Sequence, residues 1–337
     1  MGTIYPSRTD LVTAMRNPQV SYKVDELVGG SVIQKGSRII QYSGGYTTVF
    51  PFHTKDSKKV AVRCWIADIG DAKKRSLEIS SFLSSLKSPY FCEFQYLDNA
   101  LLINGSACPI VMMDWVDGKT LKTFINENIY SNPKLISKVR ENFKEMVGYF
   151  HNKNIAHGDL QHGNILVNPD ASLTIIDYDS MYIKPLEGMT DAIKGLSGYQ
   201  HPSRQGNQFI NSKLDYFSEL VIYLSLLVFE DKPALWQNYH ETEDLLFSKE
   251  DFSDSNSSSL INGLLNSTHS EIAELTVKLV EELKKTDFLK LRPLEDLLMN
   301  KLQVAKEGIF DKWTKQQNSQ ATRKTELPNT KMIIDKF

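Results

Sequence analysis

Cysteine, net charge and long apolar runs are all scarce in this sequence of 337 residues. The three cysteines, Cys64, Cys92 and Cys108, are odd in number and lack the paired spacings of a zinc site, so we expect reduced core thiols rather than a disulfide framework. A formal net charge of -2 gives no global basic field, which excludes recruitment of nucleic acid or an anionic membrane by bulk charge. Any partner must therefore be recognised locally.

Membrane anchors and targeting signals are also lacking in the sequence. The longest apolar run, LVIYLSLLVF at 220–229, is too short to span a bilayer and predicts a buried helix. The first residues, MGTIYPSRTD, lack the basic and apolar regions of a signal peptide, and Pro6 stands where a myristoylation signal needs Ser or Thr. We therefore expect a cytoplasmic protein that binds neither a membrane nor nucleic acid.

The first third of the chain contains short segments that are rich in β-branched and aromatic residues and bounded by Gly, Asn, Asp or Ser. They predict a small, mostly antiparallel sheet formed by residues 32–34, 38–42, 48–52, 59–66 and 109–115. Residues 72–86 interrupt this pattern with helical spacing, and Asp71 is the expected N-cap. The predicted buried face of this helix consists of Leu77, Ile79, Phe82, Leu83 and Leu86.

After Trp115 the apolar residues recur at helical spacing, as in residues 133–153 and from Ser270 onward. The predicted fold class is therefore α+β, with a small antiparallel sheet and one helix followed by a larger helical part. A chain of this length can form two lobes, each with a core. The predicted division is an N-terminal flank, an N-lobe, a C-lobe and a polar tail at residues 1–30, 31–115, 116–311 and 312–337.

Two stretches of the predicted sheet contain groups that could bind phosphate. Gly44 and Gly45 in YSGGYTTV would let main-chain N–H groups close over anionic oxygens, although a hairpin turn without a ligand fits as well. In VAVRCW, Arg63 lies on the inward side of a strand, where a cation needs a partner. Glu78 on the following helix is the expected partner, and a purely structural ion pair is the alternative.

The stretch HGDLQHGNILVNPDASLTIIDYDS, residues 157–180, contains three oxygen-bearing side chains at informative positions. Two short apolar strands around the turn NPDA bring Asp177 back towards Asn164. Their carboxylate and amide oxygens are ligands that Mg²⁺ accepts alongside substrate phosphates. Asp159 is left to accept a proton from a hydroxyl group. The alternative is that Asp159 caps a turn and Asp177 merely ends a strand.

In their order, these motifs resemble those of eukaryotic-type protein kinases. A glycine loop, VAIK, a helix glutamate, a hinge, HRDLKPEN, DFG and APE correspond to YSGGYTTV, VAVR, Glu78, MDWV, HGDLQHGN, DYD and YQHPSR. The resemblance covers residues 31–300 and implies a bilobal protein-kinase-like fold.

The resemblance also implies roles for individual residues. Asp159 would be the catalytic base, Asn164 and Asp177 would hold magnesium, and Arg63, paired with Glu78, would replace the phosphate-contacting lysine. The ATP site would consist of Gly44, Gly45, Val49, Ala61, the gatekeeper Met113, Asp114 and Val116 at the hinge, Leu121 and Leu166. His157 and Tyr178 would join Phe82 in an internal spine, and Asp215 would tether the catalytic loop. ATP, Mg and an unidentified protein substrate or partner are the implied ligands.

The sequence departs from the family pattern mainly in its cations. Gly158 and Gln161 replace the arginine and lysine of the catalytic loop, and Arg63 replaces the strand lysine. Without the loop arginine, we expect no on-switch through phosphorylation of Ser180, Thr190 or Ser197. Asp179 replaces the last residue of DFG, which would stiffen the segment or add a metal ligand.

Three functions remain compatible with the sequence. One is ATP- and Mg-dependent phosphoryl transfer to a protein Ser or Thr hydroxyl by a divergent protein kinase. The second is a pseudokinase that serves as a nucleotide-binding or scaffold module. The third is a small-molecule kinase of the aminoglycoside or choline type, which shares the HGD form of the loop but generally lacks the long buried helix that Asp215 begins.

Overall fold

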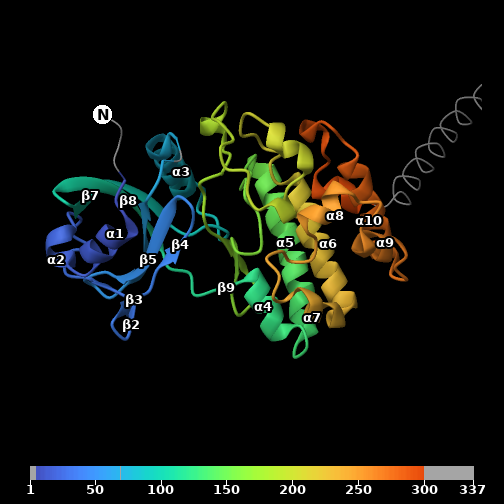
Figure 1. Ribbon diagram of the computed structural model, residues 1–337, viewed down its shortest axis with the longest axis horizontal. Coiled ribbons are helices and arrows are strands. Elements are labelled where there is room, and N and C mark those ends of the chain that lie inside the picture. The colour runs from blue at the N-terminus through green and yellow to red at the C-terminus, as the bar shows by residue number, and fades with distance from the viewer. Residues whose placement is uncertain (1–4, 69, 300–337) are drawn as a thin grey trace, which may run out of the picture. The chain divides into compact units, whose positions relative to one another are not determined.

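The computed structural model describes residues 5–68 and 70–299. The chain divides into two units, Met1–Leu294 and Glu295–Phe337. In the first unit, a lobe built on a curled antiparallel sheet is followed by a helical lobe (Figure 1). This arrangement confirms the predicted α+β fold class. The predicted domain boundaries stay predictions, and the polar tail at 312–337 lies outside the described residues.

The N-lobe sheet has the strand order β1-β5-β6-β8-β7, with β4 paired to β5. Its pairs are antiparallel, and β6 and β8 are joined in the register Ala61↔Met113 and Arg63↔Val111. The strands are β1 (Ser31–Val32), β4 (Tyr42–Ser43), β5 (Thr47–His53), β6 (Lys59–Trp65), β7 (Phe94–Ile103) and β8 (Ser106–Asp114), and β2 (Gln34–Lys35) pairs separately with β3 (Arg38–Ile39). This register places side chains of β5, β6 and β8 along one side of a cavity between the two lobes.

The sequence reasoning missed strand β7. Polar residues in its middle hide the strand, because Asp98 and Asn99 are typical of turns. Here they lie in an irregularity of the ladder between Leu97 and Leu101, and Asn99 has a positive φ of 51°. The Asn104-Gly105 dipeptide, with φ angles of 50° and 78°, forms the turn to β8 and is the signal that could have revealed the hairpin.

Two short helices of the predicted N-terminal flank, α1 (Arg8–Met15) and α2 (Pro18–Ser21), precede the sheet. A capping box formed by Ser7 and Asp10 starts α1. Leu11 and Met15 of α1 are fully buried in one core cluster with sheet residues such as Phe52. The helices at residues 8–21 therefore share the core of the N-lobe.

Helix α3 (Ala72–Leu86) has the bounds that its periodicity predicted. Ile79 and Leu83 are buried as expected, but Leu77 is 46% exposed, and the inward side of the helix is completed by Arg75 and Ser76. Asp71 precedes the helix without the expected cap, because its left-handed backbone (φ 49°) leaves its side chain without a capping hydrogen bond. The face of α3 that turns inward is thus more polar than predicted.

The C-lobe is organised around the buried helix α6 (Tyr216–Asp231), which contains the apolar run predicted to be a core helix. Helix α5 (Pro133–Lys153) packs against it, and Phe143 and Phe150 of α5 are buried as predicted. The remaining helices that the figure labels are α4 (Leu121–Asn128), α7 (Trp236–Tyr239), α8 (Lys249–Ser253), α9 (Ser259–Leu265) and α10 (Ser270–Leu283) (Figure 1). Within residues 5–68 and 70–299, no helix is both long enough and apolar enough to cross a membrane.

A small sheet lies at the boundary between the lobes. Strands β10 (Ile165–Val167) and β11 (Leu173–Ile175) form the predicted hairpin, with Ile165 opposite Ile175. Strand β9 (Lys119–Thr120) pairs with the other edge of β10. Because a hairpin register is set locally, Asn164 and Asp177 come to lie at the same end of it.

Replacing Leu11 with Ala should lower the free energy of unfolding by about 2–5 kcal/mol, because a fully buried leucine of the N-lobe core is truncated. Val20→Ala is the matched control: Val20 is 72% exposed, so its truncation should change stability by less than about 0.5 kcal/mol. Urea unfolding measures both. Equal, small effects of the two substitutions would show that the N-terminal helices are not part of the lobe core.

Candidate active site

A cavity of about 410 Å³ lies between the lobes and contains most of the predicted ATP-site residues. The residues that line it and were predicted to contact the base are Val49, Ala61, Met113, Asp114, Val116 and Leu166. They come from β5, β6, β8, the segment after β8 and β10, so apolar side chains approach the cavity from both lobes. An apolar slot with polar groups at one end is typical of a site for a flat heterocyclic ligand.

Three predicted ATP-site residues lie outside this lining. Gly44 and Gly45 form the exposed tip of the hairpin between β4 and β5, where the Gly44 N–H donates to the Thr47 carbonyl at 2.9 Å. Leu121 is fully buried at the start of α4. The glycines at the hairpin tip do not line the cavity. Thr120, the N-cap residue of α4, lines the wall in place of Leu121, which is the first residue of the helix. Further lining residues that the sequence reasoning did not assign are Tyr42, Thr47, Cys92, Trp115, Gly118, Gly163 and Ile176.

Arg63 lines the cavity at its polar end, and its side chain is only 3% exposed. Its Nη1 donates to Asp179 Oδ1 at 2.7 Å, and its Nη2 donates to Asp179 Oδ2. Nη2 also lies 3.3 Å from Asp177 Oδ1. The expected ion pair with Glu78 is therefore wrong, because the inward positions of α3 near the segment after β11 are taken by Arg75 and Ser76, and Asp179 supplies the carboxylate.

Charge around Arg63 is balanced by this pair of aspartates. Burial alone would lower the pKa of Arg63, but Asp179 and Asp177 outweigh it and raise the pKa above its ordinary value. A second buried cation, Arg75 of α3, donates to the carbonyl oxygen of Thr190. Arg75 lies close enough to Asp179 to interact with its charge, but of the two arginines Arg63 alone lines the cavity.

Asp159 and Asn164 form a hydrogen-bonded pair in the loop before β10. The Asn164 Nδ2 group donates to the Asp159 carbonyl at 2.8 Å and to Asp159 Oδ2 at 3.2 Å. The other carboxylate oxygen, Asp159 Oδ1, accepts from the Leu196 N–H at 3.1 Å. Burial raises the pKa of Asp159 above its usual value, and His157 and the Leu196 N–H oppose that shift.

Asp177 follows β11 and brings a carboxylate to the same cavity that Asn164 lines. Its backbone is left-handed (φ 66°), an uncommon conformation for a non-glycine residue that tends to occur at functional sites. Its side chain is 49% exposed; desolvation by the surrounding protein and the charge of Asp179 raise its pKa, whereas Arg63 lowers it. Because the Asn164 amide nitrogen is engaged with Asp159, the amide oxygen of Asn164 remains as an acceptor in the cavity that Asp177 also lines. This hard-oxygen donor set fits a divalent cation such as Mg²⁺.

The backbone of the catalytic loop is anchored by Asp215, as the resemblance implied. Its carboxylate accepts from the N–H groups of His157 and Gly158, the latter at 2.8 Å. Gly158 has a φ of 80°, and a Cβ atom there would lie 2.2 Å from the Ser180 carbonyl oxygen. The arginine usual in this position of the family therefore cannot be accommodated in this loop conformation.

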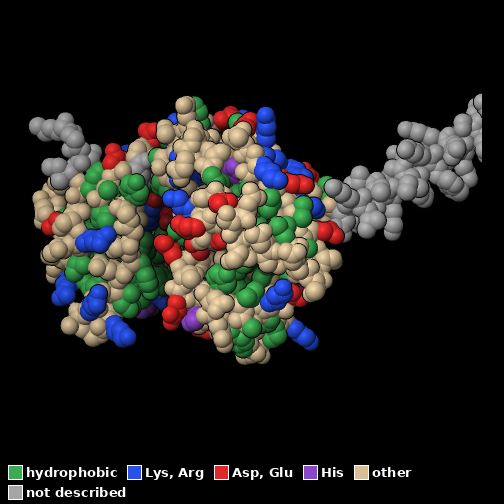
Figure 2. Space-filling view, turned by 45° about the vertical axis from the view of Figure 1, so that its right-hand side comes forward, with side chains coloured by type: hydrophobic (Ala, Val, Ile, Leu, Met, Phe, Trp, Pro, Cys, Tyr) green, Lys and Arg blue, Asp and Glu red, His purple; other side chains and the backbone are tan. Residues whose placement is uncertain are grey.

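A second, open cavity of about 620 Å³ is lined by Asp159 and shares Gly163 with the first. Gln161 lines it but turns back on its own loop, where its Oε1 accepts from the Gly163 N–H at 2.6 Å. His162 Nδ1 lies 2.5 Å from the Tyr199 hydroxyl, and burial lowers the pKa of His162 to about 4, so the ring is neutral at pH 7. In Figure 2, acidic side chains gather beside the hollow between the lobes.

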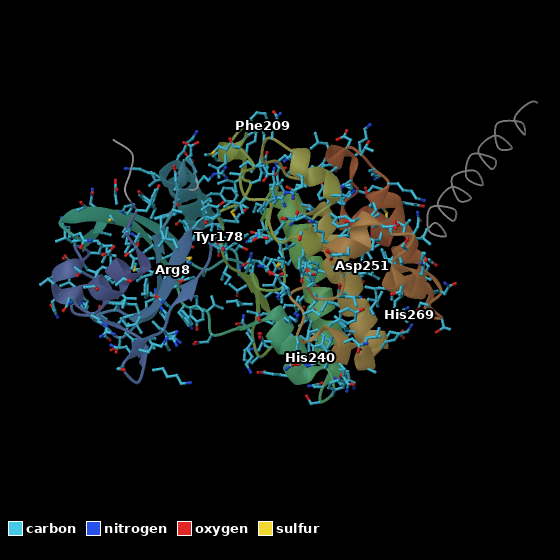
Figure 3. The ribbon with its side chains drawn as sticks, viewed as in Figure 1. Arg8, Tyr178, Phe209, His240, Asp251 and His269 are labelled. Atoms are coloured by element: carbon cyan, nitrogen blue, oxygen red, sulfur yellow. The ribbon has the colours of Figure 1, made fainter. Side chains whose placement is uncertain are left out.

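Tyr178 connects the segment after β11 to the N-lobe and lies between the two lobes (Figure 3). Its ring contacts those of Phe91, Phe94 and His157, with centroids 5.7, 5.4 and 6.4 Å away. Its hydroxyl donates to the Ile175 carbonyl at 2.7 Å. The expected spine pairing of His157 and Tyr178 is found, but the N-lobe rings are supplied by the segment before and at the start of β7 rather than by Phe82.

Asp179→Asn should lower the free energy of unfolding by about 3 kcal/mol, because it removes one carboxylate from the buried guanidinium of Arg63. Glu78→Gln is the matched control and should change it by less than about 0.5 kcal/mol, since Glu78 is not among the ion-pair partners of Arg63. Urea unfolding at pH 7 measures both variants. A larger loss of stability in Glu78→Gln than in Asp179→Asn would show that Glu78, and not Asp179, is the partner of Arg63.

Comparison with known proteins agrees with this geometry. Residues 43–290 match the protein kinase domain family. The chain is similar to a probable serine/threonine-protein kinase, SCO3848, of Streptomyces coelicolor, with 22% identity over 55% of this chain and 28% of that protein. It is also similar to the serine/threonine-protein kinases ste20 of Emericella nidulans, with 27% identity over 40% of this chain and 15% of that protein, and PknB of Mycobacterium tuberculosis, with 22% identity over 40% and 23%. The chain spans less than a third of the length of these curated relatives. The matched residues cover most of the chain, which therefore belongs to the protein kinase domain family.

Proposed function

We propose that this chain transfers the γ-phosphoryl group of ATP, in a magnesium-dependent reaction, to a Ser or Thr hydroxyl of a protein substrate. The observation that carries the proposal is that Arg63, Asn164 and Asp177 line one apolar cavity, while Asp159, which is hydrogen-bonded to Asn164, lines a second, open cavity. The names of the kinase relatives support a Ser or Thr acceptor.

In this proposal the apolar walls hold the adenine base, and Arg63 lies at the end of the cavity where the phosphates would be. Magnesium bound by Asn164 and Asp177 would neutralise charge on the phosphates. Asp159 faces the open cavity, through which an acceptor hydroxyl could approach. Its carboxylate is oriented by Asn164 and by the Leu196 N–H, so it can orient the hydroxyl and accept its proton.

A cytoplasmic location is part of this proposal. The three free cysteines, Cys64, Cys92 and Cys108, support it, because a reducing compartment keeps such thiols unpaired.

One observation favours a second candidate function, in which the chain binds a nucleotide but transfers little phosphate. Arg63 is already engaged by Asp179 in a two-pronged ion pair, and such pairs are the strong ones. Gln161, in place of the loop lysine, bonds its own loop and brings no charge to the phosphates. Transfer therefore requires Arg63 to contact phosphate while remaining paired, or to exchange partners.

Asp159→Asn should reduce kcat by about 10²- to 10⁴-fold and leave the KM for ATP nearly unchanged, because the amide cannot accept the hydroxyl proton. Transfer of radiolabelled phosphate from ATP to a mixed protein substrate, or to the chain itself, measures the effect. Asp170→Asn, at an exposed carboxylate in the turn between β10 and β11, is the control and should leave kcat unchanged. Full turnover by the Asp159 variant would remove Asp159 from the mechanism.

ATP with magnesium should raise the melting temperature of the protein more than ATP alone, with about 2.7 kcal/mol of stabilisation when ligand exceeds its Kd a hundredfold. Asn164→Ala should abolish the magnesium-dependent part of the shift because it removes an oxygen ligand. A thermal shift without radiolabel transfer would select the nucleotide-binding module. Absence of any shift with ATP would contradict both candidates.

A further inference from the structure

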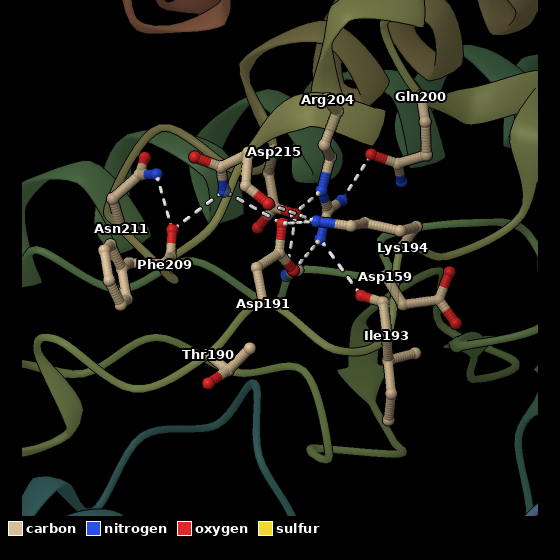
Figure 4. Close-up of polar contacts among 12 residues, drawn as sticks. Asp159, Thr190, Asp191, Ile193, Lys194, Gln200, Arg204, Phe209, Asn211 and Asp215 are labelled. Atoms are coloured by element: carbon tan, nitrogen blue, oxygen red, sulfur yellow. Dashed lines mark hydrogen bonds and ion pairs between the residues drawn. The ribbon is translucent and has the colours of Figure 1, made fainter.

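The segment from Asp177 to Pro202, which resembles a kinase activation segment, is closed by a buried ion pair. Arg204 is fully buried, Asp191 is 3% exposed, and Arg204 Nη2 lies 3.1 Å from Asp191 Oδ1. Figure 4 shows the guanidinium of Arg204 directed at the Asp191 carboxylate. A charge pair this deeply buried is costly to leave unmatched, so each partner constrains the other.

The remaining acceptor positions of Asp191 are also used. Lys194 Nζ and Asn207 Nδ2 donate to Asp191 Oδ2 at 3.1 and 2.9 Å. Burial alone would raise the pKa of Asp191, but Arg204 and these donors outweigh it and lower the pKa. Asp191 is therefore a buried anion surrounded by two cations and an amide, all from residues 191–207.

Main-chain hydrogen bonds join residues 189–191 to residues 208–210. The Asp191 N–H donates to the Gln208 carbonyl at 2.9 Å, and the Ile210 N–H donates to the Met189 carbonyl at 2.9 Å. Arg75 of α3 donates to the Thr190 carbonyl in between. The segment is thus a closed loop whose base is tied to the N-lobe helix.

Arg204 also supports the part of the segment that touches Asp159. Its Nη1 donates to Gln200 Oε1, and Gln200 Nε2 is buried without a hydrogen-bond partner among the described residues. A Cβ atom at Gly195 would lie 2.9 Å from that Nε2 atom and 2.5 Å from Asp159 Oδ1. Gly195 is therefore packed between Gln200 and the catalytic carboxylate, and the adjacent Leu196 N–H donates to that carboxylate.

Phosphorylation has no comparable place in this arrangement. Gly158 leaves no room for the loop arginine that would bind a phosphate. Ser180 is 4% exposed, whereas Thr190 and Ser197 are exposed, so only the last two are accessible. Arg204 is already paired with Asp191 and Gln200, and Arg75 already donates to the Thr190 carbonyl.

We propose that Arg204, held by Asp191, is a positioning residue that keeps residues 191–204 against Asp159 without phosphorylation. This proposal rests on the proposed function, in which Asp159 is the base. Arg204 acts through Gln200 and the Gly195–Leu196 backbone rather than by touching a substrate.

The first test is Arg204→Gln, which removes the charge and keeps a hydrogen-bonding side chain. Kcat should fall at least tenfold with the KM for ATP unchanged, and hydrogen exchange of residues 189–210 should accelerate while that of α6 does not. Lys184→Ala is the matched control, because it removes an exposed ion pair with Glu187 from the same segment. It should change neither quantity. Wild-type kcat and exchange in folded Arg204→Gln would overturn the proposal.

The second readout is rescue by the conservative variant. Arg204→Lys keeps a cation beside Asp191 and should recover part of the kcat lost in Arg204→Gln, with the KM for ATP unchanged in both variants. Equal kcat in the two folded variants would contradict the positioning role.

If Arg204→Gln does not fold, the hydrogen exchange of Arg204→Lys tests the proposal in its place. The lysine variant retains the charge but lacks the forked guanidinium that bonds Asp191 and Gln200 together, so faster exchange of residues 189–210 with an unchanged KM for ATP supports the proposal. Unchanged exchange in that variant overturns it.

The phosphorylation arm uses the full chain before and after phosphatase treatment, together with the double variant Thr190→Ala, Ser197→Ala. Activity and hydrogen exchange should be the same in all three samples, and loss of either after dephosphorylation would overturn the proposal. Hydrogen exchange does not depend on turnover. A wild-type protein that transfers no phosphate would therefore refute the proposed function, while the exchange of Arg204→Gln would still decide whether the ion pair orders the segment.

Discussion

The burial of Arg63 is the constraint on which the rest of the site depends. A guanidinium group cannot lose its charge, so at 2% exposure it must be matched by carboxylates. Asp179 and Asp177 provide them, and both lie directly after β11. One ion-pair cluster therefore connects strand β6 of the N-lobe to the end of the β10–β11 hairpin at which Asp177 and Asn164 line the same cavity. The position of the proposed metal ligands and that of the proposed phosphate contact are set together.

The distribution of charge differs from that of the family pattern. Cations are missing from the catalytic loop, where Gly158 contacts the Ser180 backbone and Gln161 folds onto Gly163. Buried arginines on other elements take their place around the site: Arg63 on a strand, Arg75 on a helix and Arg204 after the activation segment. Because the interior screens charge poorly, such groups act on Asp159 and on the aspartates of the DYD motif without being neighbours in sequence.

Short-range parts of the site could be predicted from the sequence. The β10–β11 hairpin and the approach of Asp177 to Asn164 follow from two apolar strands around a tight turn, and the bounds of α3 follow from its periodicity. The partner of Arg63 could not be predicted, because the rotation of α3 against the sheet is set by packing. The N-terminal helices could not be predicted because two apolar residues, Leu11 and Met15, do not establish a helical pattern. Strand β7 could not be predicted because Asp98 and Asn99 are residues typical of turns.

By itself, the sequence determined the fold class, the family and the groups that carry the proposed chemistry, Asp159, Asn164 and Asp177, since these depend on local patterns and fixed spacings. Tertiary structure alone decided which charges meet. The Arg63–Asp179 pair joins residues 116 positions apart, and Arg204 reaches Asp191 and Gln200 only after the segment folds back on itself. Ion pairs depend on distance and burial, and neither quantity is encoded in the spacing of residues along the chain.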